Sequence, residues 1–184
     1  MEPTRVVTKT KWSIDPAHSE IGFSVKHLMF SKVRGRFKEF EAQIFTTGDD
    51  FMSAEIDIRI RAASIDTNME QRDQHLRSVD FFDSEQFHEI RFTGRDWGAN
   101  NHEGHHMLSG ELQMKGIKKP VNLHVEFGPR MKDPWGVEKA LFNINAKINR
   151  KDWGLNYNSA LETGGVLISE DVWIHCEVQL IKSA

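Results

Sequence analysis

Apolar and polar residues alternate along most of this chain with a period of two. The clearest run is Met52–Arg61, in which Met, Ala and three Ile residues alternate with Ser, Glu, Asp and two Arg residues. Successive side chains of a β-strand point to opposite faces, so this run predicts a strand with one apolar face and one solvated face. A helix would need a period of 3.6, which the run lacks.

Seven further segments show the same alternation, some of them weakly. The eight predicted strands are Ile21–His27, Val33–Phe45, Met52–Arg61, Ile90–Trp97, His105–Met114, Val121–Phe127, Ala140–Ile148 and Val172–Leu180. Within the second segment the alternation shifts phase between Phe37 and Phe40, which indicates a bulge or a sharp bend. The polar stretch Gly98–Gly104 separates two segments and predicts a hairpin.

One short helix is expected after the third strand. Thr67 is predicted as its N-cap, because Glu70 follows three residues later and completes a capping box. This signal opens a helix over Asn68–Arg77.

Eight half-polar antiparallel strands can form either a sandwich or a closed barrel. Closure removes the exposed edges, and eight strands leave an interior wide enough for one small ligand. We therefore predict an all-β fold, an eight-stranded antiparallel β-barrel. Six small residues in inward phase would leave space inside it: Gly35, Ala42, Ala54, Gly110, Ala140 and Ala146. The pattern alone leaves open whether the barrel is hollow or filled.

Length and composition exclude several classes of protein. The 184 residues fit a single domain, 1–184, with no linker or internal repeat. The 24 basic and 27 acidic residues are spread along the chain, so we expect no nucleic-acid partner, which would need a basic stripe. No run approaches the roughly 20 apolar residues of a membrane span, and the polar Met1–Lys11 segment lacks the apolar core of a signal peptide. We expect a cytoplasmic protein that does not span a membrane, and the sequence leaves a homodimer open.

Several short motifs carry a resemblance to a known family. They are Asp15–Ser19, Phe23, Val25, His27–Met29, Gly35–Phe37, Ser64–Thr67, Arg72–Ser78, Asp80–Asp83, Gly110–Leu112, Gly116, Pro120–Val121 and Ile148–Leu155. In this order and spacing, from Trp12 to Val178, the chain resembles the YceI-like family of lipid-binding proteins. The resemblance implies a lipocalin-like, eight-stranded antiparallel barrel that binds polyisoprenoids or other long-chain amphiphiles in its lumen. It implies no catalytic residue. Members are often periplasmic, so the lack of a recognisable signal peptide is a departure.

An amphipathic ligand needs a dry space for its tail. The inward residues predicted to contact the tail are Phe23, Val25, Phe37, Ile56, Ile58, Leu112, Leu123, Val125, Phe142, Ile144, Ile174 and Val178. The alternative is that these side chains fill the barrel with one another, leaving an interaction module that works through its outer surface.

The head of such a ligand needs polar partners at the mouth of the barrel. His27 falls in an otherwise apolar inward row, where a buried imidazole must find a hydrogen-bond partner. Arg72, Arg77 and Arg150 are further candidates, because guanidinium groups pair with phosphates and carboxylates. The alternative for the arginines is a structural network with nearby aspartates that fixes the helix across the barrel.

One apparent catalytic motif is rejected. His102–His106 matches the zinc-protease pattern H-E-x-x-H, which works only on a helix, where residues four apart share a face. Here the segment follows a polar turn and contains Gly104, so a zinc hydrolase is a weak alternative. No nucleophile elbow, phosphate loop or dinucleotide motif is present, and Cys176 lies in an apolar row. We expect no catalytic residue, no metal site and no cofactor. The prediction is a protein that binds a long-chain lipid, with a polyisoprenoid as the first candidate, for transport or storage.

Overall fold

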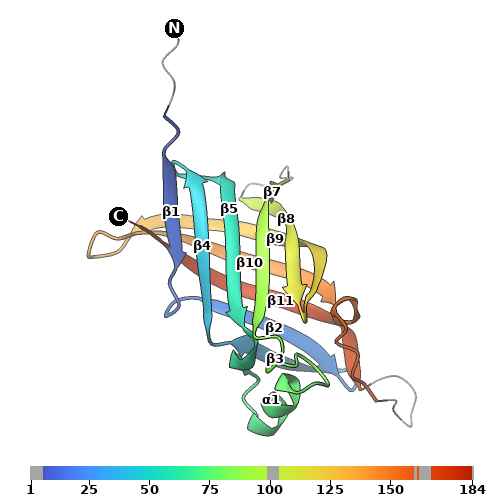
Figure 1. Cartoon of the computed structure of the whole chain (residues 1–184). Helices are drawn as coiled ribbons and strands as arrows, with labels where there is room; N and C mark the ends of the chain where they lie inside the picture. The colour runs from blue at the N-terminus through green and yellow to red at the C-terminus, as the bar shows by residue number, and fades with distance from the viewer. Residues whose placement is uncertain (1–5, 99–103, 160, 162–166, 184) are drawn as a thin grey trace.

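A computed structural model describes residues 6–98, 104–159, 161 and 167–183. Within these ranges eleven strands form one antiparallel sheet (Figure 1). The strands are β1 (Lys9–Ile14), β2 (Glu20–His27), β3 (Ser31–Phe37), β4 (Phe40–Thr47), β5 (Asp50–Arg61), β6 (Ile65–Asp66), β7 (Glu89–Trp97), β8 (His105–Met114), β9 (Ile117–Lys132), β10 (Glu138–Asn149) and β11 (Ile168–Lys182). One α-helix, α1 (Glu70–Arg77), and two 3₁₀ turns, η1 (Ala62–Ser64) and η2 (Arg150–Trp153), complete the fold.

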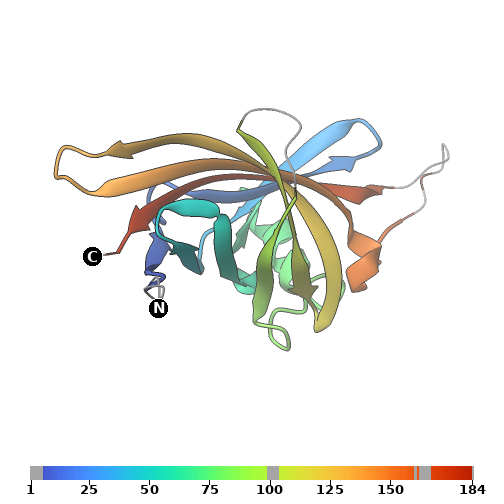
Figure 2. The same cartoon turned by 90° about the horizontal axis from the view of Figure 1, so that it is seen from above.

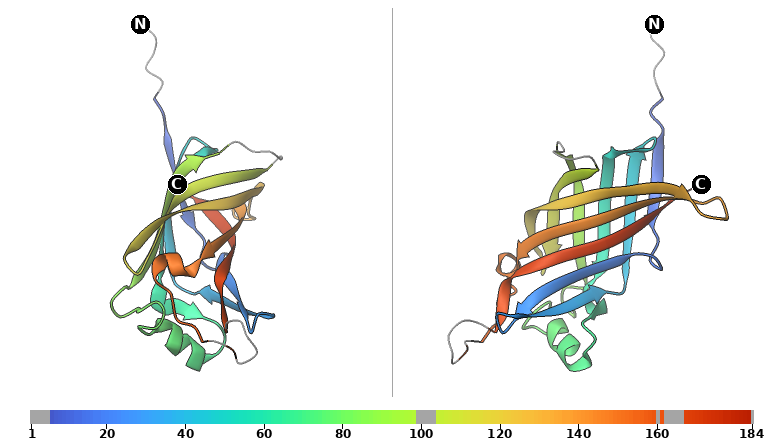
Figure 3. Two further views of the ribbon diagram at one scale, coloured as in Figure 1. Left: turned by 90° about the vertical axis from the view of Figure 1, so that its right-hand side faces the viewer. Right: turned by 180° about the vertical axis from the view of Figure 1, so that it is seen from behind.

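Eight of the strands close into a ring. Their order is β1-β4-β5-β7-β8-β9-β10-β11, and β11 pairs back onto β1. Trp12 on β1 joins the two ends, because it pairs with Ile44 on one side and with Lys182 on the other. The closed eight-stranded antiparallel barrel predicted from the sequence is thus confirmed. Strands β2, β3 and β6 extend the sheet from the other half of β11 (Figure 3).

The strands that form the ring are not all the ones predicted from the sequence. The segment Val33–Phe45 is two strands, since the chain bends at Lys38 and Glu39, where the phase shift was found. Strand β1 was missed, because KTKWSI offers only Trp12 and Ile14 as apolar alternation. Each change adds one strand, but β2 and β3 lie outside the ring, so the ring still has eight strands.

The helix lies where it was expected, but its predicted N-cap is wrong. Helix α1 begins at Glu70, and its N-cap is Met69, which makes no side-chain capping bond. The Thr67 hydroxyl instead donates to the buried Asp73 carboxylate and accepts a 2.7 Å hydrogen bond from Arg72. Those bonds tie the helix to the strand before it, so Thr67 is not available to cap. In the described ranges no helix is long and apolar enough to cross a bilayer.

Aromatic rings fill one half of the barrel. Trp12, Phe51, Phe127 and Phe142, here called the aromatic plug, pack with ring centroids 4.8 to 5.1 Å apart along the chain of contacts. Trp12 is fully buried, and its indole nitrogen donates to the Thr46 hydroxyl at 3.0 Å. Edge-to-face and tilted packing of this kind adds to the burial of apolar area. This half of the interior is therefore closed to a ligand.

Candidate ligand-binding site

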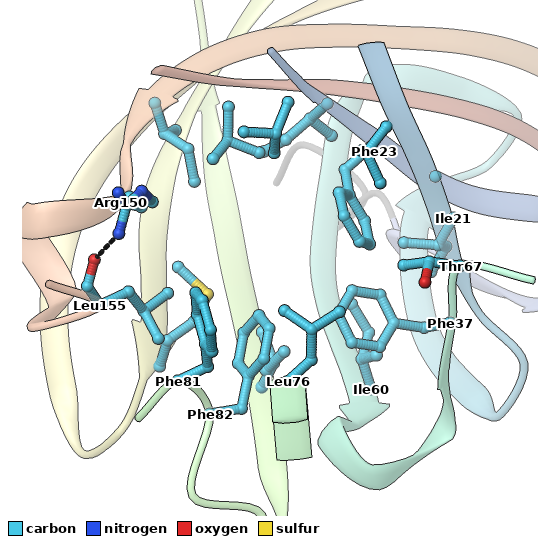
Figure 4. Close-up of a pocket in the computed structure, with 18 of the residues that line it drawn as sticks. Ile21, Phe23, Phe37, Ile60, Thr67, Leu76, Phe81, Phe82, Arg150 and Leu155 are labelled. Carbon is cyan, nitrogen blue, oxygen red and sulfur yellow. Dashed lines mark hydrogen bonds between the residues drawn. The ribbon is translucent and has the colours of Figure 1, made fainter. Parts of the chain in front are cut away.

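The other half of the barrel is hollow. A cavity of about 360 Å³ lies inside the sheet, and its walls come from β2, β3, β5 and β7 to β11. Leu76 of helix α1 and the following Phe81 and Phe82 cover it from below (Figure 4). Phe37 and Phe23 close one side, with their ring centroids 5.7 Å apart. Most wall residues are aliphatic or aromatic, so the cavity is suited to an apolar molecule.

The predicted tail contacts divide into two groups. Eight line the cavity: Phe23, Val25, Phe37, Ile58, Leu112, Leu123, Ile144 and Ile174. Four do not: Ile56, Val125, Phe142 and Val178. Each of these four lies on its strand two residues beyond a lining residue, namely Ile58, Leu123, Ile144 and Cys176. The four therefore lie deeper in the barrel than the cavity, and one of them, Phe142, belongs to the aromatic plug. The period of two gave the inward face of these strands, except at the start of β5, where Phe51 is buried and the predicted Met52 is 38% exposed, but it did not give the depth at which the barrel is filled.

The six small residues in inward phase do not form the cavity. The expectation that they would leave space inside the barrel is therefore wrong. None of the six lines its wall. A Cβ atom at Gly35 would lie 2.4 Å from the Phe23 ring, and one at Gly110 would lie 2.5 Å from the Phe92 ring. Aromatic side chains therefore lie flat over these glycines and use the space. The hollow arises instead where aliphatic wall residues face one another between the plug and the helix.

The polar lining gathers where the cavity meets the surface. Lys26 and His27 come from β2, Arg72 and His75 from α1, and Tyr157 from the segment after η2. All five are at least partly exposed, which marks this side as the mouth. The His75 imidazole is 2.8 Å from an Asp80 carboxylate oxygen and packs edge-on against the Tyr157 ring. His27 and Arg72 thus lie at the mouth, and their contact with a head group stays a prediction.

Arg150 has the most unusual environment of the predicted residues. It lines the cavity and is 3% exposed, and its guanidinium donates to four backbone carbonyl oxygens, those of Leu155, Tyr157, Ile168 and Ser169 (Figure 4). Burial lowers the pKa of Arg150, although the charge of Glu170 opposes this shift. An arginine still remains charged at neutral pH. Its hydrogen bonds in the described chain all go to carbonyls, so the positive charge at the cavity edge is not neutralised by a bonded carboxylate.

Arg77 does not line the cavity. Its guanidinium donates to the carbonyls of Ala63 and Ile65 and lies 3.3 Å from a Glu70 oxygen. Arg77 therefore fastens helix α1 to η1 and β6, and it does not lie with the other predicted head-group residues along the cavity. The alternative of a structural role holds for this arginine, with carbonyl oxygens in place of the expected aspartates.

Sequence reasoning missed the cover of the cavity. Leu76, Phe81 and Phe82 come from a helix and a loop, whereas the candidates were taken from strand alternation alone. The motifs that span Arg72–Asp83 were the available signal. Cys176 also lines the cavity, and burial raises the pKa of its thiol to about 12, which leaves it protonated and unreactive.

The zinc-protease pattern does not form a helix where the structure describes it. His102 and Glu103 lie outside the described residues, and strand β8 begins at His105. His105 is exposed, whereas the His106 ring packs 4.3 Å from the Phe127 ring, so the two neighbours point to opposite faces. In the described ranges no three His, Cys, Asp or Glu side chains are grouped to hold a metal ion.

Comparison with known proteins agrees with this architecture. A family model described as the YceI-like domain matches residues 12–180. The chain belongs to the YceI-like family. It is similar to a UPF0312 protein of Staphylococcus epidermidis, 38% identical over 164 residues, which are 89% of this chain and 92% of that protein. A YCEI protein of Campylobacter jejuni has a TM-score of 0.72 at 30% identity, over 92% of this chain and 96% of that one. A polyisoprenoid binding domain from Saccharophagus degradans shares the fold, with a TM-score of 0.69 at 14% identity, over 94% and 98% of the two chains.

Proposed function

We propose that this YceI-like protein binds a long-chain amphipathic lipid, a polyisoprenoid, with its tail in the cavity. The observation that carries the proposal is a largely apolar cavity of about 360 Å³ whose exposed and partly exposed polar side chains gather at the mouth. Small-molecule sites commonly occupy about 300–1,000 Å³ and combine an apolar wall with a few polar groups. A structural neighbour named as a polyisoprenoid binding domain supports the same ligand class.

The energy of such binding depends on chain length. A five-carbon isoprene unit gains on the order of 4 kcal/mol when it leaves water, at about 0.8 kcal/mol per carbon. Association costs roughly 4–15 kcal/mol, so one or two units bind weakly and a longer chain binds tightly. The aromatic plug limits how much chain can be buried, and the rest must lie at the mouth.

The head group is expected to meet the polar side chains at the mouth. His27 and Arg72 are partly exposed there, and Arg150 adds a positive charge at the cavity edge. A hydroxyl, carbonyl or phosphate oxygen would accept hydrogen bonds from these groups. We infer a carrier or storage role, because the polar groups at the mouth can hold a head group while the aliphatic and aromatic side chains of the wall hold the tail.

Lipid extraction tests the proposal directly. The purified protein is extracted with organic solvent, and the extract is analysed by mass spectrometry for polyisoprenoids and other long-chain lipids. We expect one lipid per protein chain, with affinity for added polyprenols that rises with chain length. A protein that contains no lipid and binds no polyprenol of any length would contradict the proposal.

A further inference from the structure

The turn between β2 and β3 exposes three consecutive large apolar residues. Leu28, Met29 and Phe30 are 50%, 62% and 91% exposed. Single exposed apolar side chains are common on protein surfaces, but a contiguous apolar tip usually marks a contact with another molecule or a membrane. The three residues are called the apolar tip below.

The backbone of the apolar tip is held in an unfavourable conformation. Leu28 and Met29 have positive φ angles, 52° and 61°, and the Phe30 N–H donates to the His27 carbonyl at 3.2 Å. Hairpin turns of this geometry normally place Asn and Gly at the two central positions, because bulky residues rarely adopt positive φ. The folded state therefore keeps large apolar side chains where small polar ones would be more stable, and such local conflicts concentrate at functional positions.

The hairpin that carries the tip is strongly basic. No Asp or Glu occurs between Ile21 and Lys38, in a chain whose net charge is -3. Five basic residues lie in this stretch and all are exposed: Lys26, Lys32, Arg34, Arg36 and Lys38. Lys26 and Lys32 face each other across the two strands beside the tip. Apolar side chains flanked by lysines complement a bilayer with anionic head groups.

The apolar tip also lies next to the mouth of the cavity. Lys26, His27 and Val33 of the same hairpin line the cavity. The Leu28 N–H donates to the carbonyl of Leu167, another lining residue, at 2.9 Å. Figure 2 shows the β2–β3 hairpin projecting at the opposite end of the molecule from the β9–β10 hairpin. A surface that meets the tip would therefore meet the mouth as well.

We propose that the apolar tip and its lysines dock the protein on an anionic lipid bilayer, with the cavity mouth facing the membrane. The tip enters the head-group region, and Lys26 and Lys32 contact anionic lipids on either side. This docking goes beyond lipid binding in the cavity, although its benefit, direct exchange of cargo with the bilayer, rests on the proposed function.

Vesicle co-sedimentation at low salt tests the docking. Wild-type protein is expected to bind phosphatidylglycerol vesicles and to bind phosphatidylcholine vesicles weakly. Phe30→Ser should weaken binding on the order of ten- to a hundredfold, as expected when one large apolar side chain no longer leaves water. Lys26→Gln with Lys32→Gln should weaken it about 25-fold, at about fivefold for each charge. Matched controls are Trp135→Ser, an 85% exposed aromatic on the β9–β10 turn, and Lys9→Gln with Lys11→Gln on β1.

A second variant separates docking from folding. Leu28→Asn with Met29→Gly suits the turn, so it should raise the midpoint of thermal unfolding while it lowers vesicle binding. Binding of a detergent-delivered polyprenol should survive in Phe30→Ser, which distinguishes failure of docking from failure of the proposed function. Docking is refuted if wild-type protein ignores phosphatidylglycerol vesicles, or if the tip variants bind as well as the Trp135 and β1 controls.

Discussion

Replacing Ile144 by Trp should block the cavity without unfolding the barrel. Ile144 is half-buried on β10 and lines the cavity, so an indole at this position would extend into the 360 Å³ of empty space. It would displace about one isoprene unit of a bound tail, a gross loss on the order of 4 kcal/mol or nearly a thousandfold in Kd. Readjustment of a flexible tail would recover part of this loss, so we expect binding to weaken about 30-fold or more.

The assay is titration of the protein with a fluorescent polyprenol, followed by urea unfolding of the same samples. Overpacking a filled core usually costs about 1–3 kcal/mol, and the empty space around Ile144 should keep the cost at the lower end. Asn143→Trp is the matched control, because this exposed neighbour lies on the outer face of the same strand. Unchanged affinity in a folded Ile144→Trp protein would show that the tail binds somewhere else.

Three further changes probe the plug, the buried arginine and a surface ion pair. Phe142→Ala removes a ring from the aromatic plug and should lower the free energy of unfolding by about 3–5 kcal/mol, while a series of polyprenols should show that longer chains gain affinity. Arg150→Met leaves four carbonyl oxygens without their donor and should cost about 3 kcal/mol or more in urea unfolding. Arg150→Lys should recover only part of this, since an ammonium group lacks the planar fork. Hydrogen bonds from Arg91, at 2.9 and 2.7 Å, hold the pKa of Asp57 below its ordinary value of 3.8. The stability from this pair is present above about pH 4 and is lost as the pH falls through the lowered pKa, so wild-type and Asp57→Asn unfolding midpoints should differ at neutral pH and converge in acid.

The sequence predicted the sheet well, because the alternation of apolar and polar neighbours indicates which side of a strand faces the interior. The alternation in Ala54–Arg61 fixed which side of β5 faces inward, and the phase shift after Phe37 marked the bend between β3 and β4. Strand β1 carried too few apolar residues to be recognised, and it is held in place by pairing with β4 and β11. That pairing depends on residues more than 30 and more than 160 positions away, which no local pattern contains.

The candidate site was predicted less completely, because depth inside a barrel is a tertiary property. Val125 and Leu123 have the same phase and similar chemistry, yet only Leu123 lines the cavity. The difference is set by the aromatic plug, whose rings come from four different strands. The arginines show the same limit, because Arg77 and Arg150 find carbonyl partners that the sequence does not disclose.

The aromatic plug has a consequence for the order of events in binding. If the tail enters through the mouth, as proposed, the plug at the other end of the described barrel means that it leaves through the mouth as well. The isoprene unit that enters first would then leave last. An acceptor would bind the head group of the lipid while its tail is still in the cavity. Release of the lipid would then have a fixed direction, and its rate should depend on the acceptor present at the mouth of the cavity.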